Sequence, residues 1–410
     1  MSQEFEIITT TGPGTVKADL LRALANWKHV LPQQTSAAIV LKPNFNSNMN
    51  ALTGNTTDLR VIAGVVEFLQ TSGYSDITVC DGPSSGFARA RVSVMHRLKI
   101  DRLAAHYGIK MIDINTCTET ISVPLASGGA VQVPAFLANA DFIINLPKIK
   151  THCEAGMSCC LKNLVGVCAG PVHKLKMHMD LPNNILKVNE VIRPGLHVVD
   201  GNFAMEGNGP SAGIPVNLGK MLIGTNPFQL DYLCARIVGF PITEVKTLKA
   251  ALDRGIISEE TRRAWDAINL EKAPVAFQMP HLNFLASLVM DNRKASIWFR
   301  NTWLGNLLAG SRNFKKLLLM AGISQEVFNL QESDLSYKLD RAKCTTCGKC
   351  TAYCPQDLSL DQIAAAEGKT CMGCLYCFSV CPDDAISLVG DRGFFAVQME
   401  KYGAKIRSIA

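Results

Sequence analysis

A four-cysteine motif that occurs twice near the end of the chain restricts the possible folds more than any other feature. Its spacing is C-x2-C-x2-C-x3-C-P, in residues 344–355 and again in residues 371–382. A tight loop of this kind lets three thiolates converge on one iron–sulfur cubane, and the fourth cysteine, before proline, reaches the other cubane. The repeated motif therefore predicts two [4Fe–4S] clusters.

The spacing also predicts which thiols share a cluster. Cluster 1 takes Cys344, Cys347, Cys350 and Cys381, and cluster 2 takes Cys371, Cys374, Cys377 and Cys354. Zinc knuckles or disulfides are the alternatives, but zinc sites usually use C-x2-C pairs separated by a longer span. The stretch from about residue 340 to 389 resembles the bacterial two-cluster ferredoxin domain, with a longer segment between the two motifs.

Composition limits the remaining possibilities. The 410 residues are 48% hydrophobic and 19% charged, which indicates a folded protein with a sizeable core and length for two or three domains. The net charge of +6 comes without a Lys/Arg run or an RNA-binding signature. We therefore expect no nucleic-acid partner, and an anionic small molecule explains the positive excess better.

Three observations bear on localisation. Eight of the 15 cysteines are assigned to clusters, which suits a reducing interior. The first residues lack the basic and apolar regions of a signal peptide, and no run of about 18 apolar residues predicts a transmembrane helix. We expect a cytoplasmic protein from an organism that lives with little oxygen.

Short apolar runs alternate with amphipathic segments through the first 240 residues. The runs predict buried strands at residues 37–41, 76–80, 141–146, 196–199 and 220–223. Helical spacing predicts helices at 15–27, 58–72 and 231–238 and a helical region at 88–107, and residues 121–133 are expected to form a hairpin. The alternation predicts an α/β main domain, a mostly parallel sheet with flanking helices.

The chain divides into four expected segments. They are an α/β domain at 1–256, a helical connector at 257–337, a small α+β ferredoxin-like domain at 338–392 and a C-terminal tail at 393–410. Apolar residues recur at helical spacing in the connector, with Arg and Lys between them, which favours helices that pack the ferredoxin module on the main domain. The alternative is a basic amphipathic surface that meets a membrane or a partner protein. The basic end of the tail is expected to fray.

Polar residues follow four of the predicted strands. They are Lys42, Asn44, Asp81, Lys148, Lys150, Thr151, His152 and Asp200. Ligands of parallel sheets bind outside the carboxyl ends of the strands, so we expect these residues to gather on one rim. Ordinary strand-ending turns are the alternative, although a lysine contributes nothing to a turn.

The segment from residue 148 to 178 is unusually rich in Lys, His, Cys and Asn. Its lysines can hold a carboxylate or a phosphate, and His152 can act as a general acid or base. Its thiols are candidates for a further divalent metal site or a reactive cysteine, and otherwise behave as small buried hydrophobes. These thiols are Cys153, Cys159, Cys160 and Cys168.

Several short motifs between about residues 37 and 240 resemble the family called domain of unknown function 362. They are Leu41-Lys-Pro-Asn44, Asp81-Gly82, Asn145-Leu-Pro-Lys148-x-Lys150-Thr-His152, Leu161-Lys162-Asn163-Leu-x-Gly166, Asp200-Gly201 and Glu206-Gly-Asn-Gly209-Pro210, with a later Asp231. Members often carry a ferredoxin domain behind this region. The resemblance implies the architecture and the site residues, and it implies no settled reaction.

Two functions remain open. In the first, electrons enter through the ferredoxin module and reach an anionic substrate on the rim. The catalytic candidates are His152, Lys150 and Asp81, and the substrate-binding candidates are Lys42, Asn44, Lys148, Lys162, Asn163, Asp200 and Glu206. In the second, the protein is a non-catalytic electron carrier or maturation protein, and the α/β domain recognises a partner protein instead.

Overall fold

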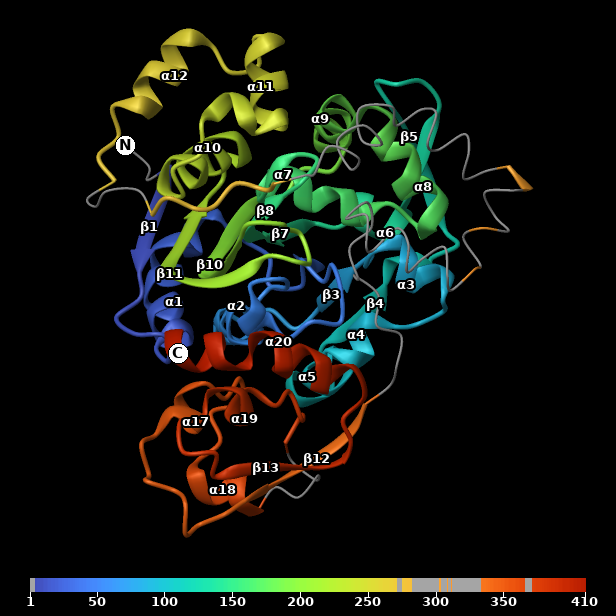
Figure 1. Cartoon of the computed structure of the whole chain (residues 1–410). Helices are drawn as coiled ribbons and strands as arrows, with labels where there is room; N and C mark the ends of the chain where they lie inside the picture. The colour runs from blue at the N-terminus through green and yellow to red at the C-terminus, as the bar shows by residue number, and fades with distance from the viewer. Residues whose placement is uncertain are drawn as a thin grey trace.

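The computed structural model describes residues 4–270, 275–281, 302–303, 308, 311, 333–365 and 371–410. A mixed nine-stranded sheet lies in the main domain with helices around it (Figure 1). The small C-terminal domain, orange at the bottom of Figure 1, is separated from the sheet by helix α20 (Gly393–Ile409). Most of the predicted connector lies outside the described residues.

The sheet has the order β1-β11-β10-β7-β2-β3-β4, and β8 pairs with β10 and β9. Its strands are β1 (Phe5–Thr9), β2 (Ile39–Pro43), β3 (Ile77–Asp81), β4 (Lys110–Asp113), β7 (Phe142–Leu146), β8 (Lys148–His152), β9 (Gly156–Ser158), β10 (Leu196–Glu206) and β11 (Ile214–Gly224). Strands β4, β3, β2, β7 and β10 are parallel, whereas β11 and β1 add antiparallel pairs at one side. Strands β5 (Thr120–Pro124) and β6 (Ala130–Pro134) form the predicted hairpin.

The helices of the main domain range from one turn to about three and a half turns. They are α1 (Val16–Leu24), α2 (Leu59–Thr71), α3 (Ser85–Arg89), α4 (Val94–Arg97), α5 (Ile100–Tyr107), α6 (Ala135–Ala138), α7 (Cys160–Asn163), α8 (Gly170–Met177), α9 (Leu181–Val191), α10 (Pro227–Ile237), α11 (Lys246–Asp253) and α12 (Glu259–Asp266). None of the described helices has the length and apolar content needed to cross a bilayer.

The predicted α/β architecture is confirmed, and burial explains it. All five residues of β2 and of β3 are buried, because apolar side chains cover both faces of these parallel strands. One core lies around α1 and α2, and the second lies around α7 to α11. The second core includes Trp265 and Phe277, so its packing continues past residue 256.

Three parts of the main domain differ from the sequence-based prediction. Residues 88–107 are divided among α3, α4 and α5, because Arg91 and Lys99 take left-handed backbone angles, with φ of 56° and 63°. Residues 148–152, expected as a polar rim segment, form strand β8. Residues 220–223 belong to the long antiparallel strand β11, whose carboxyl end lies away from the ends of its parallel neighbours.

Among the described residues, the C-terminal domain contains one antiparallel strand pair and three short helices. Its elements are β12 (Asp334–Leu339), α17 (Lys349–Ala352), α18 (Leu360–Ala365), α19 (Tyr376–Val380) and β13 (Ile386–Asp391). The two strands pair along their whole length, from Asp334 opposite Asp391 to Leu339 opposite Ile386. This arrangement brings the two cysteine motifs together in one small domain.

The prediction of a frayed C-terminal tail is wrong. Residues 393–409 form α20, and Phe395, Tyr402 and Ile406 are buried on it. The helix packs against the ferredoxin-type domain on one side and against β11 on the other (Figure 1). The prediction rested on the basic residues at the end of the chain and overlooked the apolar residues, which recur at helical spacing and form the buried face of α20.

Candidate functional site

Polar residues at the carboxyl ends of the parallel strands lie side by side. Lys42 of β2 is in register with Asn145 of β7, and Asp81 ends the neighbouring strand β3. On the other side, Asp200 of β10 is in register with Lys148 of β8. Parallel pairing therefore places these residues at one edge of the sheet, where such folds bind ligands.

Two buried ion pairs connect these strand ends. Lys42 Nζ lies 2.6 Å from Asp81 Oδ1, and Lys148 Nζ lies 2.8 Å from Asp200 Oδ2. All four side chains are buried. The second oxygen of Asp81 accepts the main-chain N–H of Phe45 at 2.5 Å. A buried charge is costly without a partner, so each pair holds its two strands in one arrangement.

Lys150 has a different environment from Lys42 and Lys148, because no carboxylate of the described residues pairs with it. Its Nζ donates to Asn44 Oδ1 at 2.8 Å and to the carbonyl oxygen of Asn55 at 2.6 Å. Burial, followed by the charges of Lys162 and Lys148, lowers the pKa of Lys150 well below its ordinary value. The ammonium therefore loses its proton more easily than an exposed lysine does.

Asn163, the last residue of α7, connects this helix to the strand ends. Its Oδ1 accepts the Nδ2 of Asn44 at 2.9 Å. Its own Nδ2 donates to the carbonyl oxygen of Lys42 at 3.0 Å and to Asn145 Oδ1 at 2.7 Å. These bonds hold α7 against β2 and β7 and fix the orientation of Asn44.

A cavity of about 220 Å³ lies at this edge of the sheet. Five of the predicted site residues line it, namely Asn44, Asp81, His152, Lys162 and Asn163. Because Asp81 is paired with Lys42, it adds little free negative charge to the wall. The lysines give the cavity a positive potential that suits an anionic ligand.

Two glycines allow the cavity wall to pack closely. A methyl group on Gly166 would lie 2.5 Å from Asp81 Oδ1 and 2.8 Å from Lys42 Nζ. A methyl group on Gly82 would lie 2.7 Å from Lys174 Nζ. Any larger side chain at these positions would displace the charged groups, so the sequence Leu-Val-Gly166 keeps the ion pair at the edge of the cavity.

Sequence reasoning did not assign six further polar residues of the cavity wall. They are Asn46, Ser84, Ser85, Lys174, His178 and Ser211. Two signals were present in the sequence, because Ser84 follows Asp81-Gly82 directly and Lys174 and His178 have the i, i+4 spacing of one helix face. No sequence pattern indicated Ser211, because it reaches the cavity only through the path of the loop after β10.

Lys174 is the second lysine of the wall. Its Nζ donates to the carbonyl oxygen of Pro83 at 2.9 Å and also bonds the side chain of Asn115. Burial lowers the pKa of Lys174 to about 8, and the charge of Asp81 acts in the opposite direction. His178 Nδ1 lies 2.9 Å from Glu154 Oε2.

The remaining predicted residues lie outside the cavity wall. Lys148 and Asp200 pair with each other in the buried layer, and Asp200 also accepts the main-chain N–H of Asp58 at 2.8 Å. Glu206, at the end of β10, accepts the main-chain N–H of Gln278 at 2.9 Å. Lys42 and Lys150 contact the wall residues Asp81 and Asn44 from behind.

The cysteines predicted for cluster 1 lie around one hollow. Cys344, Cys347, Cys350 and Cys381 line a cavity of about 120 Å³ in the C-terminal domain. Burial, followed by the charges of Cys344 and Cys347, raises the pKa of Cys350. Four thiols around one hollow fit the needs of a cubane. Cys347 is exposed, so this group faces the solvent.

The cysteines predicted for cluster 2 are also close together. Burial, followed by the charges of Cys354, Cys377 and Cys371, raises the pKa of Cys374 well above its ordinary value. Cys374 also packs against the core around α1 and α2. The second group therefore fits a cubane that faces the main domain.

The two domains meet beside Cys374. Cys374 and Thr57 line the same small cavity of about 50 Å³ between the domains. The main-chain N–H of Leu59, at the start of α2, donates to the hydroxyl of Tyr376 at 3.3 Å. Thr57 Oγ1 in turn accepts the main-chain N–H of Asn44 at 2.8 Å. Thr57 thus lines the small cavity beside Cys374 and is hydrogen-bonded to Asn44, a residue of the larger cavity's wall.

Comparison with known families gives two matches. Residues 39–236 match the family described as "Domain of unknown function (DUF362)". Residues 336–382 match a 4Fe-4S dicluster domain. Both resemblances stated from the motifs are confirmed, and the C-terminal domain is of the iron–sulfur type.

One curated relative is the "Thylakoid-associated protein sll1697" of Synechocystis sp., which is 26% identical over 275 residues, covering 62% of this chain and 75% of that protein. The lactate racemase apoprotein from Thermoanaerobacterium thermosaccharolyticum has a TM-score of 0.40 and 12% identity, over 57% of this chain and 56% of that one. A crystal structure of a protein from Thermotoga maritima has a TM-score of 0.32 and 15% identity, over 48% of this chain and 53% of that one. This chain spans little more than half of either structure.

Proposed function

We propose that this protein, which combines a DUF362 domain with a C-terminal 4Fe–4S dicluster domain, is an iron–sulfur oxidoreductase that reduces a small anion. One observation carries the proposal. Asn44 shares the wall of a cavity with Lys162 and Lys174, and its main-chain N–H bonds Thr57, which lines a second cavity together with Cys374. An anion in the cavity would contact Asn44, which Thr57 relates to the second cysteine group.

The cavity wall supports binding of a carboxylate or a phosphate. Lys162 and Lys174 supply charge, and Asn163, Ser84 and Ser85 supply neutral polar groups. Charge-assisted hydrogen bonds of this kind are about twice as strong as neutral ones. The ion pair of Lys42 with Asp81 and the bonds of Lys150 keep the remaining buried charges in place behind the wall.

Two wall residues suit proton transfer. His152 Nδ1 accepts the main-chain N–H of Glu154 at 3.1 Å, so a neutral imidazole carries its proton on Nε2. The pKa of Lys174, about 8, is close to neutral pH, which suits a group that gives and regains a proton. His152 is our candidate for the proton donor, and Lys174 is a second candidate that the structure adds.

The clusters, when bound, supply single electrons, and the two cysteine groups described above would hold them. Exposed Cys347 suggests that electrons enter the first cluster from a redox partner protein, and the packing of Cys374 suggests that they leave through the second. We expect this chemistry to serve anaerobic metabolism in the cytoplasm. The alternative is a non-catalytic electron carrier or maturation protein, which the exposure of Cys347 also favours.

The test uses the reduced full-length protein under anaerobic conditions. Small carboxylates and phosphate esters are added one at a time, and reoxidation is followed through the visible absorbance of the clusters. We expect one anion class to reoxidise the protein without a partner. Lys162→Ala should raise the half-saturating concentration by on the order of tenfold or more, because one charge-assisted contact is lost.

The matched control is Lys187→Ala, because Lys187 is a surface lysine paired with Glu190 outside the cavity. It should behave like the unaltered protein. If no anion reoxidises the clusters and only a partner protein does, the electron-carrier function replaces the proposed one. If Lys162→Ala and Lys187→Ala behave alike, the anion binds elsewhere.

A further inference from the structure

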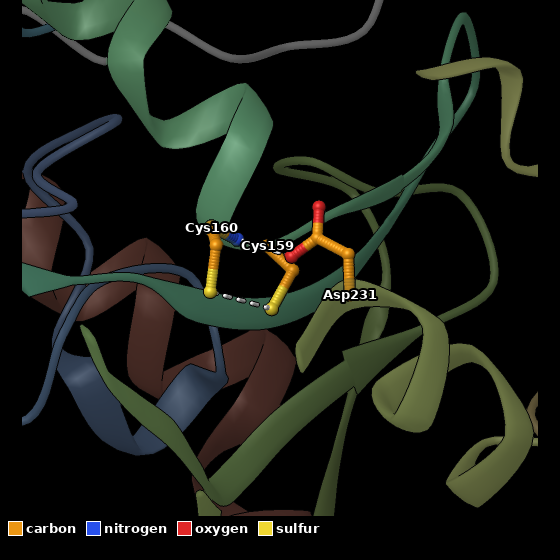
Figure 2. A group of neighbouring side chains, drawn as sticks. All are labelled: Cys159, Cys160 and Asp231. Carbon is orange, nitrogen blue, oxygen red and sulfur yellow. Dashed lines mark hydrogen bonds between the residues drawn. The ribbon is translucent and has the colours of Figure 1, made fainter. Parts of the chain in front are cut away.

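Two thiols and one carboxylate lie close together in the second core, outside the iron–sulfur domain, and a third thiol lies beside one of them. Cys159 Sγ lies 4.0 Å from Cys160 Sγ and 3.7 Å from Cys234 Sγ. The ligand atoms of Cys159, Cys160 and Asp231 lie within 4.8 Å of one another, and no other such group of three occurs among the described residues. Figure 2 shows the two neighbouring thiols on the same side of the chain, with Asp231 reaching them from α10.

The sulfur distances match those of a metal coordinated by thiolates. A zinc–sulfur bond is about 2.3 Å long, so two sulfurs in a tetrahedral site lie about 3.8 Å apart. The observed distances of 3.7 and 4.0 Å lie on either side of this value. Asp231 and Cys234 occupy positions i and i+3 of α10, so one helix face supplies a carboxylate oxygen and a thiol.

Helix capping explains only part of this arrangement. Asp231 Oδ1 accepts the main-chain N–H of Cys160 at 2.6 Å, and Oδ2 accepts that of Leu161 at 3.2 Å. These bonds hold the start of α7, and they leave further lone pairs on the carboxylate. They do not explain why the Cys159 thiol lies beside the thiols of both Cys160 and Cys234, because a cap needs no sulfur.

We propose that Cys159, Cys160, Cys234 and Asp231 bind a thiolate-preferring divalent ion, of which Zn²⁺ is the type, in a closed structural site. All four side chains are buried, and four protein ligands leave no position for a substrate. Each thiol that becomes a ligand releases its proton as its metal–sulfur bond forms, and nothing is oxidised or reduced. Of the four cysteines singled out in the sequence, Cys153 and Cys168 do not belong to this site.

The ion would hold α7 in place. This helix begins at Cys160 and ends at Asn163, so its first turn carries the proposed ligand and its end reaches the anion cavity. The metal would therefore fix Asn163 from within the protein without contacting a ligand in the cavity. The inference does not depend on the proposed redox activity.

The test measures metal content in the full-length protein with its clusters reconstituted under anaerobic conditions. We expect about one zinc per chain besides the cluster iron. X-ray absorption at the zinc edge should show three sulfur neighbours at about 2.3 Å and one oxygen at about 2.0–2.2 Å. Zinc captured at an unfilled cluster position would show four sulfurs and no oxygen, and that result would overturn the proposal.

Cysteine variants locate the ion. Cys159→Ser and Cys234→Ser should each lose the zinc while iron per chain stays unchanged. Cys168→Ser is the control, because Cys168 is also buried in the second core but lies outside the group. The proposal fails if the unaltered protein binds no zinc, or if zinc survives in both variants. Where a variant does not fold, the zinc-edge spectrum of the unaltered protein decides the question.

Discussion

Lys42 and Asp81 form an ion pair 2.6 Å long between adjacent parallel strands, and both side chains are buried. Asp81 also lines the cavity of about 220 Å³ at the strand ends, whereas Lys42 lies behind it. The pair therefore stabilises the sheet and also belongs to the site. Its loss should lower the free energy of unfolding, in addition to any effect on activity.

The first prediction concerns this pair. Asp81→Asn should reduce the free energy of unfolding by about 3–5 kcal/mol, because it leaves the Lys42 ammonium buried without a counter-charge. Adding Lys42→Met should recover part of the loss. Urea unfolding under anaerobic conditions measures both. The control is Asp76→Asn, which breaks the exposed pair with Lys110 and should cost less than about 1 kcal/mol. Equal losses from Asp81→Asn and Asp76→Asn would contradict the role of burial.

The second prediction concerns pH. Because burial lowers the pKa of Lys174 to about 8, its ammonium is charged below pH 8 and neutral above it. Anion affinity should therefore fall as the pH rises through about 8. In the unfolded chain Lys174 has a pKa near 10.4, so between about pH 8 and 10.4 the unfolded state holds a proton that the folded state has lost. The contribution of Lys174 to the free energy of unfolding should therefore rise with pH across this range.

Calorimetric titration with phosphate or a small carboxylate at several pH values tests this prediction. Because an arginine stays charged through this range, Lys174→Arg should abolish the step near pH 8 while keeping anion binding. A step of the same size in Lys174→Arg would assign the pH dependence to another group.

The third prediction concerns helix α20. Ile406→Ala should destabilise the protein by about 2–5 kcal/mol, because Ile406 is fully buried in the core that the two domains share. Val397→Ala, on the exposed side of the same helix, should change stability by less than about 0.5 kcal/mol. Thermal unfolding compares the two variants, and a similar effect of both would show that α20 contributes helix propensity alone.

The fourth prediction concerns the clusters. Cys347→Ser should lower iron from about eight to about four atoms per chain when one cubane is lost, and Cys374→Ser should do the same for the other. Electron paramagnetic resonance of the reduced protein should then show one cluster in place of two interacting ones. Cys117→Ser, in the main domain, should keep all the iron. Full iron in both cluster variants would refute the ligand assignment.

Several features could be predicted from residue order alone. The eight cluster cysteines follow a local spacing rule, and apolar runs such as 37–41 and 76–80 become strands because a buried parallel strand needs such a run. The same parallel pairing predicts that Asn44 and Asp81 lie near one edge of the sheet, whereas Asn163 was a candidate only through its family motif. In each case the relevant physics acts over a few residues or follows from one rule of sheet topology.

Other features depended on contacts between distant segments. The polar sequence 148–152 forms β8, in which Lys148 and Lys150 bond Asp200 and Asn44, and no local pattern shows such pairing. The thiol group needed α7 and α10, about 70 residues apart, to bring Cys234 to Cys159. The basic C-terminus became an ordered helix because two domains buried its apolar face. The sequence determines which side chains are present, whereas the tertiary structure determines which of them are buried together as partners.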